Sequence, residues 1–313
     1  MRSTDYYAAI DLGSNSFHML VVRVVAGSIE VVSKTRRKVR LASGLTNNGG
    51  LSASARVRAL DCLAIFAEQV KGIPAENITA VGTATLRKIN SNDPFLAQIQ
   101  QTLGHPLRVI SGEEEAATIF QGIAHTTAHN GRLLAIDIGG ASTELALGQD
   151  FQPQLLRSLD FGCVTWNTRF FPNQLISEQG CSDAIAEVTS ITAEHAPLYR
   201  EHGWDVVLGA SGTFKALQEV AFARKMAGLI TLPWLEELLE ESLQFTNITE
   251  LDIRGLLSSR QPTFISGLCI LIGLFRALQI DSLEATEGAL REGLIFALLE
   301  QRLQKPFTGM FKS

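Results

Sequence analysis

The sequence has little of what marks several common classes of protein. Its 313 residues include four cysteines, Cys62, Cys163, Cys181 and Cys269, and no two of them form a C-x-x-C pair. This spacing excludes a zinc knuckle and predicts reduced thiols in a cytoplasmic protein. No Walker P-loop and no Ser–His–Asp nucleophile motif is present, so neither of these two common sites is expected.

Long hydrophobic runs are also absent. The longest apolar stretch, residues 264–275, contains Ser266 and two glycines and is followed by Arg276. Because a membrane span takes about 20 apolar residues, this stretch predicts a buried helix and no membrane partner. The polar segment 1–7 leads directly into a strand-like sequence, so no apolar signal segment is expected.

The overall composition is that of a soluble globular protein. Apolar residues make up 46% of the chain, enough to bury a core that offsets the entropy of ordering the chain. A length of 313 residues exceeds what one hydrophobic core usually organises, which predicts two domains. The formal net charge of −5 argues against nucleic acid as a partner of the whole surface.

One segment departs from this negative balance. Five cations lie within seven residues, after the alternating segment 29–32: Lys34, Arg36, Arg37, Lys38 and Arg40. If that strand continues, Arg36, Lys38 and Arg40 share one face. Two interpretations stay open, a solvated edge strand protected against mispairing and a ledge that guides a polyanion.

The most informative feature is an internal repeat. Residues 8–20 read AAIDLGSNSFHML and residues 134–146 read LAIDIGGASTELA, with Asp11 and Asp137 in register. Each copy predicts an apolar strand, a carboxylate near its end, a Gly/Ser/Asn turn and a second strand. Such hairpin tips suit phosphate oxygens, and the aspartate suits a hydrated cation. One copy is weak evidence, but two copies a domain's length apart predict two similar domains.

Helix and strand patterns alternate through both halves, which predicts an α/β fold. We expect helices over residues 51–70, 111–123 and 182–198, and strands over residues 78–82, 107–110 and 205–208. The polar, glycine-containing segment 125–132 is the predicted hinge. The predicted domains are therefore residues 1–127 and 128–313.

Glu115 is the first candidate for chemistry. It falls on the same predicted helix face as Ile119 and Ile123, a face that should be buried. A carboxylate on an apolar stripe is a candidate general base or metal ligand. The two glutamates before it are explained by helix capping and by the helix dipole.

Asp137 and Glu144 form an acidic pair across a predicted hairpin turn, and two carboxylates with phosphate oxygens and water usually hold magnesium. The alternative is that Glu144 points to solvent from an ordinary strand.

Arg87 follows a strand and a threonine-rich turn, where a guanidinium is well placed to contact phosphate. The alternative is an exposed arginine at the start of a helix. The loop 209–213 is a weak phosphate-binding signal.

These motifs resemble the actin/Hsp70/sugar-kinase superfamily and, more closely, the exopolyphosphatase/guanosine pentaphosphate phosphatase (Ppx/GppA) family. The matching blocks follow the family's order: DLGSNSFHML (11–20), TATLR (83–87), ISGEEEA (110–116), DIGGASTEL (137–145), GASGT (209–213) and GALREG (288–293). The resemblance implies an α/β protein of two ribonuclease H-like domains with a cleft between them.

The resemblance also implies an activity, namely hydrolysis of the terminal phosphoanhydride of pppGpp or of inorganic polyphosphate, with Mg²⁺ as cofactor and a small polyanion as substrate. Glu115 matches the family's water-activating glutamate and Arg87 its cleft arginine. The expected metal-associated acids are Asp11, Asp137 and Glu144. The expected phosphate-binding residues are Gly13, Ser14, Asn15, Ser16, Gly139, Gly140, Ala141, Ser142, Gly209, Ser211, Gly212 and Thr213. The expected polyanion-guiding residues are Lys34, Arg36, Lys38 and Arg40.

Some features depart from the family pattern. Ala141 stands where many polyphosphatase-like members have a third glycine, which favours the pentaphosphate phosphatases. Long members carry further C-terminal helical domains, so a chain that ends at Ser313 is expected to be a short form, and a homodimer stays open. A nucleotide sensor without turnover and an ATP-dependent kinase of the same fold are the competing functions.

Overall fold

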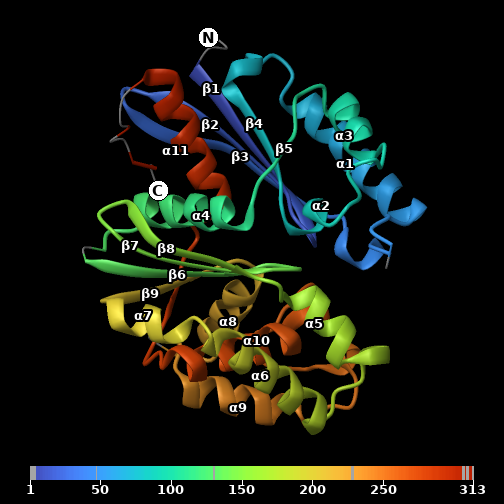
Figure 1. Cartoon of the computed structure of the whole chain (residues 1–313), viewed down its shortest axis with the longest axis vertical. Coiled ribbons are helices and arrows are strands. Elements are labelled where there is room, and N and C mark those ends of the chain that lie inside the picture. Colours follow the sequence, from blue (N-terminus) through green and yellow to red (C-terminus); the bar gives the residue numbers. More distant parts are fainter. Residues whose placement is uncertain are drawn as a thin grey trace. The chain divides into compact units, whose positions relative to one another are not determined.

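The computed structural model describes residues 5–46, 48–129, 131–226, 229–304, 307, 310 and 311. The chain forms two compact units, one of Met1–Ala128 with Gly288–Ser313 and the other of His129–Glu287. Each unit contains a five-stranded sheet with helices packed on it (Figure 1). The predicted α/β class is confirmed.

The sheet of the first unit is built around the first copy of the repeat. Its strands are β1 (Tyr6–Leu12), β2 (Ser16–Val25), β3 (Ser28–Lys38), β4 (Ile78–Gly82) and β5 (Arg108–Val109), in the order β3-β2-β1-β4-β5. β1 is antiparallel to β2 and parallel to β4. The strand predicted over 78–82 is confirmed, whereas the one predicted over 107–110 is shortened to two residues.

The second sheet has the same topology. Its strands are β6 (Arg132–Ile138), β7 (Thr143–Gln149), β8 (Gln152–Leu159), β9 (Val206–Ala210) and β10 (Glu284–Ala285), in the order β10-β9-β6-β7-β8. β6 is antiparallel to β7 and parallel to β9, as β1 is to β2 and β4. The repeat read in the sequence is therefore a repeat of structure, with equivalent hairpins β1–β2 and β6–β7.

Helices cover both faces of the first sheet. They are α1 (Ala53–Gln69), α2 (Ala84–Arg87), α3 (Phe95–Leu103), α4 (Gly112–Thr126) and α11 (Leu290–Leu303), with short 3₁₀ turns at Ala42–Gly44 and Ala75–Asn77. Ile10 and Phe17 of the sheet pack with Phe66 of α1 and Ile99 of α3 in one core. α11 packs on β1 and on α4 instead (Figure 1).

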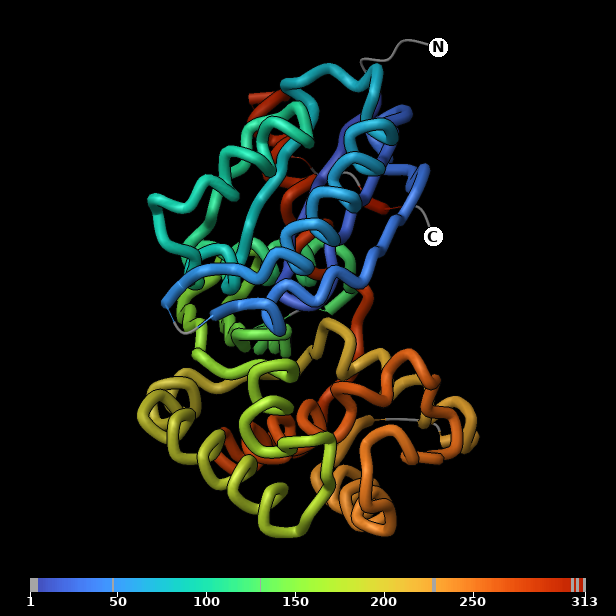
Figure 2. Tube along the Cα trace, turned by 90° about the vertical axis from the view of Figure 1, so that its right-hand side faces the viewer, coloured from blue at the N-terminus to red at the C-terminus, as the bar shows by residue number. Residues whose placement is uncertain are grey.

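The position of α11 corrects the predicted domain boundary. The sequence places all residues after 127 in one domain, but Gly288–Ser313 belongs to the first unit, and Figure 2 shows the red C-terminal chain among its blue and cyan segments. Glycines allow the close approach: a Cβ at Gly122 would overlap the carbonyl oxygen of Ala289, and a Cβ at Gly293 would overlap that of Thr118. This packing accounts for the glycines of the GALREG block.

The second unit is centred on one apolar helix. Its helices are α5 (Cys163–Phe170), α6 (Glu178–Ala193), α7 (Ala196–His202), α8 (Gly212–Ala223), α9 (Leu232–Ser242) and α10 (Gln261–Leu278), with 3₁₀ turns at Pro172–Gln174 and Ile248–Glu250. α10 is long and apolar enough to cross a membrane by length and composition alone, but 78% of it is buried inside the protein. The predicted buried helix is confirmed.

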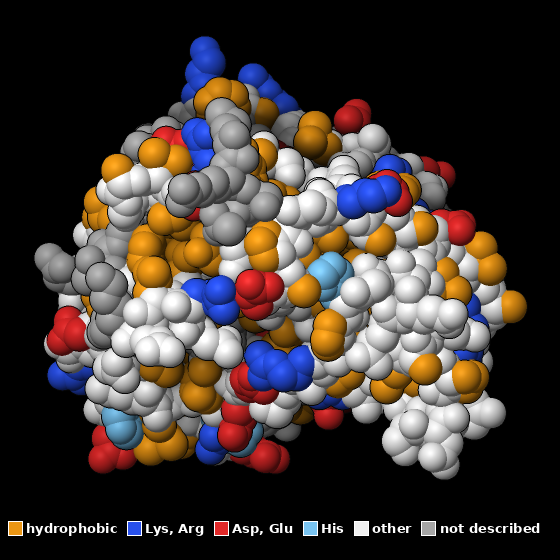
Figure 3. Space-filling view, turned by 90° about the horizontal axis from the view of Figure 1, so that it is seen from above, with side chains coloured by type: hydrophobic (Ala, Val, Ile, Leu, Met, Phe, Trp, Pro, Cys, Tyr) orange, Lys and Arg blue, Asp and Glu red, His pale blue; other side chains and the backbone are white. Residues whose placement is uncertain are grey.

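Two further predictions concern thiols and surface charge. All four cysteines are free and buried, as expected for core thiols. On the face shown in Figure 3, acidic and basic side chains are interspersed among hydrophobic and neutral ones.

Candidate active site

The predicted residues of the first unit follow three parallel strands at one edge of the sheet. Leu12 at the end of β1 pairs with Gly82 of β4, which pairs with Val109 of β5. Parallel strands end at a common edge, where open α/β sheets bind their ligands. The turn 13–16, the segment 83–87 and the start of α4 therefore lie together.

Hydrogen bonds fix the first turn. The Thr85 hydroxyl donates to Ser14 Oγ at 2.8 Å, between two buried side chains. The Asn15 carbonyl accepts the N–H groups of Val39 and Arg40 at 3.1 and 2.8 Å. The turn is therefore held between the segment that contains Arg87 and the segment that follows β3.

Glu115 and Arg87 form an ion pair beside this turn. Ser111 caps α4 by accepting the Glu114 N–H at 3.1 Å, and Glu115 follows in the first helical turn with 7% of its surface exposed. Glu115 Oε2 lies 2.7 Å from Arg87 Nη1, which also donates to the Ile110 carbonyl. Burial raises the pKa of Glu115, and the Arg87 guanidinium opposes that shift. The predicted burial of Glu115 is confirmed, and Arg87 is not an exposed helix-start arginine.

Asp11 and the cationic strand lie at the same hairpin. Asp11 is opposite His18, which is opposite Arg36, across β1, β2 and β3. Lys34 and Lys38 alternate with Arg36 on that face, and Arg36 Nε donates to Ser16 Oγ at 3.3 Å. The prediction for Arg40 is wrong in one respect. β3 ends at Lys38, and Arg40 has a φ of 53°, outside the strand.

In the second unit, Asp137 and Glu144 are direct partners across β6 and β7. They lie on the sheet face opposite Ile136 and Leu145, which belong to the core of this unit. Glu144 is only 2% exposed and accepts a hydrogen bond from Ser158 Oγ at 2.8 Å. The solvent-facing alternative for Glu144 is therefore wrong.

The second turn, residues 139–142, is held by the start of α5. The Gly139 carbonyl accepts the Cys163 N–H at 2.9 Å, and the Gly140 carbonyl accepts the Val164 N–H at 2.9 Å. A Cβ at Gly162 would lie 2.5 Å from the Ala141 nitrogen, so only glycine allows this approach. Ala141 and Ser142 of the turn are both buried.

The loop 209–213 lies next to the second turn. Ser211 has a φ of 93°, and its hydroxyl donates to the Ile138 carbonyl at 2.8 Å. This bond ties the end of β9 to the end of β6, next to the second turn. The structure thus gathers the predicted residues into two groups, one in each unit.

Arg260 is not among the residues that the sequence patterns single out. It lies at the start of α10, where its Nη1 is 3.6 Å from the position of a Cβ on Gly212. Its Nη2 donates to Glu219 at 3.2 Å, whereas its Nε and Nη1 are buried and have no hydrogen-bond partner among the described residues. Buried donors of this kind beside a glycine-rich loop suit an oxyanion. The contact depends on tertiary packing, and the only local signal is an arginine just before an apolar helix.

Asp137 and Glu144 are the donors best placed for a metal. Across the described ranges, no group of three or more His, Cys, Asp and Glu residues is arranged to hold one. The predicted acids divide between the units, with Asp11 in the first and the Asp137–Glu144 pair in the second. Two hard carboxylates on one face fit Mg²⁺, which retains several waters and takes one or two protein carboxylates.

The duplicated sheets and the turns at their edges define an α/β protein of two similar units. The chain belongs to the Ppx/GppA phosphatase family, whose sequence profile matches residues 20–302. The resemblance seen in the sequence is thereby confirmed.

The chain is similar to proteins named guanosine-5'-triphosphate,3'-diphosphate pyrophosphatase. One from Aliivibrio fischeri is 50% identical over 295 residues, which cover 94% of this chain and 59% of that protein. One from Vibrio cholerae is 48% identical over 303 residues, which cover 97% of this chain and 61% of that protein. The chain thus spans about three fifths of the length of the curated relatives it matches.

Solved structures show the same fold. An exopolyphosphatase from Cytophaga hutchinsonii has a TM-score of 0.84 at 22% identity, with 97% of this chain and 99% of that chain covered. The Ppx/GppA family member from Aquifex aeolicus has a TM-score of 0.77 at 20% identity, with 95% and 98% covered. Both support the two-unit α/β architecture.

Proposed function

We propose that this chain hydrolyses a terminal phosphoanhydride bond, that of pppGpp to give ppGpp and phosphate or that at the end of inorganic polyphosphate. The observation that carries the proposal is the buried Glu115 carboxylate, 2.7 Å from Arg87 beside the first turn. The names of the relatives from Aliivibrio fischeri and Vibrio cholerae favour pppGpp. The buried free cysteines support a cytoplasmic location as part of the proposal.

The proposed reaction is a single in-line displacement. A water molecule positioned by Glu115 attacks the terminal phosphorus, and its proton passes to the Glu115 carboxylate. The bond from that phosphorus to the bridging oxygen breaks, and the leaving oxygen keeps the electron pair. Arg87 favours the ionised form of Glu115 and offers positive charge to the transferred group.

The turns and the loop account for substrate binding. Residues 13–16 in the first unit, with residues 139–142 and 209–213 in the second, supply backbone and hydroxyl groups for phosphate oxygens. Mg²⁺, when bound, would offset phosphate charge, and Asp137 and Glu144 of the second unit would hold it. Each unit therefore contains its own set of candidate phosphate-binding groups.

Phosphate release with Mg²⁺ from pppGpp, long-chain polyphosphate and ATP tests the proposal. We expect release from pppGpp or polyphosphate at a higher kcat/KM than from ATP, and the ratio of the first two identifies the preferred substrate. Tight binding of pppGpp without phosphate release would contradict hydrolysis and favour the sensor. ADP formation that requires a second substrate would favour the kinase.

Arg260 supplies an independent prediction. Arg260→Gln should lower kcat/KM by about 10- to 100-fold, because a charged hydrogen bond contributes about 1.5–3 kcal/mol. Arg254→Gln removes the same charge from an exposed position nearby and should leave kcat/KM unchanged. Equal values for the two variants, measured with pppGpp, would show that Arg260 has no role in substrate binding.

A further inference from the structure

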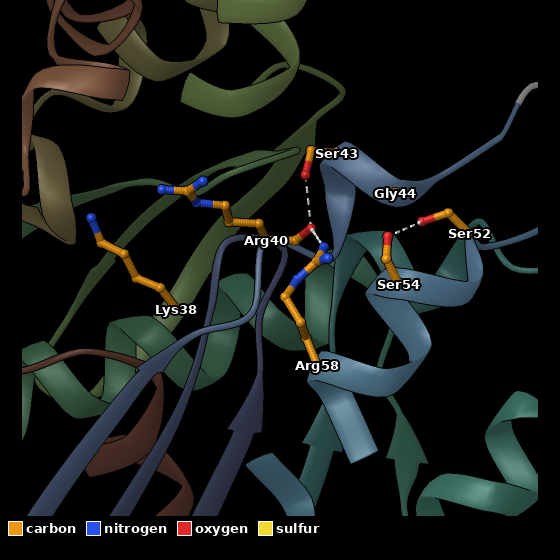
Figure 4. Close-up of a pocket in the computed structure, with 7 residues that line it drawn as sticks. All are labelled: Lys38, Arg40, Ser43, Gly44, Ser52, Ser54 and Arg58. Carbon is orange, nitrogen blue, oxygen red and sulfur yellow. Dashed lines mark hydrogen bonds between the residues drawn. The ribbon is translucent and has the colours of Figure 1, made fainter. Parts of the chain in front are cut away.

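A hollow of about 470 Å³ lies in the first unit beside the first turn (Figure 4). The residues that line it are Lys38, Arg40, Ser43, Gly44, Ser52, Ser54 and Arg58. Three of them are cations and three carry hydroxyl groups, and the described lining includes no acidic residue. We call this hollow the cationic pocket. Its volume falls within the roughly 300–1,000 Å³ of small-molecule sites.

The backbone of Arg40 is held in an unfavourable conformation at this pocket. Its φ of 53° is left-handed, which costs a residue with a side chain about 1–2 kcal/mol. Its N–H donates to Asn15, and its carbonyl accepts hydrogen bonds from Ser43 Oγ at 2.9 Å and from Arg58 Nη2 at 3.3 Å. These contacts place Arg40 in a specified position outside β3, which disfavours the edge-protection interpretation for this residue.

Arg58 adds a cation that the strand pattern does not include. It comes from α1, and its Nε donates to the Val39 carbonyl at 2.8 Å. In Figure 4 the side chains of Lys38 and Arg40 extend in the same direction, and Arg58 reaches from α1 to the Arg40 carbonyl. Three like charges around one hollow repel one another, so a bound anion would offset an unfavourable interaction.

The cationic pocket is connected to the candidate active site through the backbone. The N–H groups of Val39 and Arg40, between Lys38 and the 3₁₀ turn Ala42–Gly44, are the donors to Asn15 of the first turn. A phosphate chain whose end lies at that turn would have its next phosphates close to this segment.

We propose that the cationic pocket binds non-reacting phosphates of the substrate, a group of two or more linked phosphates away from the bond that is cleaved. This inference rests on the proposed function. The same chemistry has two sources, the interior of an inorganic polyphosphate chain and the second diphosphate of pppGpp. The pocket has a binding role only, and Glu115 remains the residue that activates the attacking water.

Ser54→Glu tests the pocket by placing a negative charge in its lining. Ser54 is exposed at the second residue of α1, where an acidic side chain interacts favourably with the helix dipole, so the fold is retained. Ala64→Glu is the matched control, because it adds the same charge at an exposed site ten residues further along α1. That is about 15 Å along the helix, beyond the screening length of about 8 Å at 0.15 M salt.

Binding titrations at 0.15 M salt measure the effect without requiring turnover. The ligands are long-chain polyphosphate, pppGpp and tripolyphosphate, added to the wild type and to both variants. Ser54→Glu should weaken binding of long-chain polyphosphate or pppGpp by about tenfold relative to Ala64→Glu, and tripolyphosphate by less. Arg40→Asn should reproduce the loss, because asparagine tolerates the left-handed conformation and removes the charge.

Each result decides the inference separately from the proposed function. A loss with polyphosphate alone assigns the pocket to the chain interior, and a loss with pppGpp assigns it to the nucleotide's second diphosphate. Equal affinities of Ser54→Glu and Ala64→Glu for both ligands, or no binding of either by the wild type, would overturn it. The wild type could instead bind these ligands through the pocket and release no phosphate. That result would refute the proposed hydrolysis and support the binding role of the pocket.

Discussion

Glu115→Gln should lower kcat for phosphate release by about 10²–10⁴-fold, which is the usual contribution of a general base. The amide oxygen of glutamine can still accept the hydrogen bond from Arg87 Nη1, now 2.7 Å from Glu115 Oε2. The position of Arg87 beside the first turn is therefore kept, and the dissociation constant for substrate should change little. The variant separates proton transfer from binding.

The same substitution should change how thermal stability depends on pH. Burial raises the pKa of Glu115 in the folded state above its value of 4.5 in the unfolded chain. The stability that the neutral carboxyl contributes is fully present below that value and is lost as pH rises through the folded pKa. As pH rises through the folded pKa, the wild type gains a buried charge that glutamine never carries, so the Tm of Glu115→Gln should rise relative to that of the wild type over that pH range.

The pH dependence of kcat checks the role of Glu115. A base acts only when ionised, so wild-type kcat should fall as pH drops through the raised pKa of Glu115. The residual rate of Glu115→Gln should lack this step. Glu113→Gln, in the same helical turn but exposed, is the control and should keep both the wild-type rate and the pH profile. A Glu115→Gln variant with near-normal kcat would rule out Glu115 as the base.

The parts of the fold that depend on local sequence were predictable. Both copies of the repeat contain Gly/Ser/Asn turn residues between strand-like segments. Both hairpins form, with Asp11 and Asp137 in equivalent places. Ser111 caps α4 as its spacing to Glu114 suggests. The apolar stripe on that helix was enough to predict that Glu115 is buried.

The parts that depend on contacts between distant residues were not predictable. α11 packs in the first unit because glycines in α4 and α11 allow their backbones to touch. The sequence of neither helix alone predicts that contact. Arg260 meets the loop 209–213 only through the packing of α8 and α10 in the second unit. Arg40 leaves the strand because Asn15 and Arg58 hold its backbone, although its neighbours favour an extended conformation.

Gly122→Ala should lower the free energy of unfolding by about 1–3 kcal/mol, the usual cost of overpacking a close contact. A Cβ at Gly122 would overlap the Ala289 carbonyl oxygen and lie 2.7 Å from the Gly293 nitrogen. Both are backbone atoms, so they cannot rotate away as a flexible side chain would. The sign of this change in free energy tests for the close contact, because alanine in place of glycine inside an unobstructed helix stabilises the helix by about 1 kcal/mol.

The matched variant is Gly293→Ala, on the opposite side of the same contact. Its Cβ would overlap the Thr118 carbonyl oxygen, so it should destabilise to a similar degree. Gln121→Ala, one residue before Gly122 in α4, adds no bulk and should lower the free energy of unfolding by less than either glycine substitution does. Urea unfolding at a constant m-value measures all three, and stabilisation by either glycine substitution would contradict the contact between α4 and α11.

Activity should fall together with stability, because α4 carries Glu115 two helical turns before Gly122. If α4 is displaced to admit the methyl group, the carboxylate moves relative to Arg87 and to the first turn. A misplacement of about 1 Å can cost a reaction about 10²-fold. The Gly122→Ala protein, assayed at a temperature where it remains folded, should therefore show a lower kcat than Gln121→Ala. Equal kcat values would mean that the packing of α11 stabilises the first unit without positioning its glutamate.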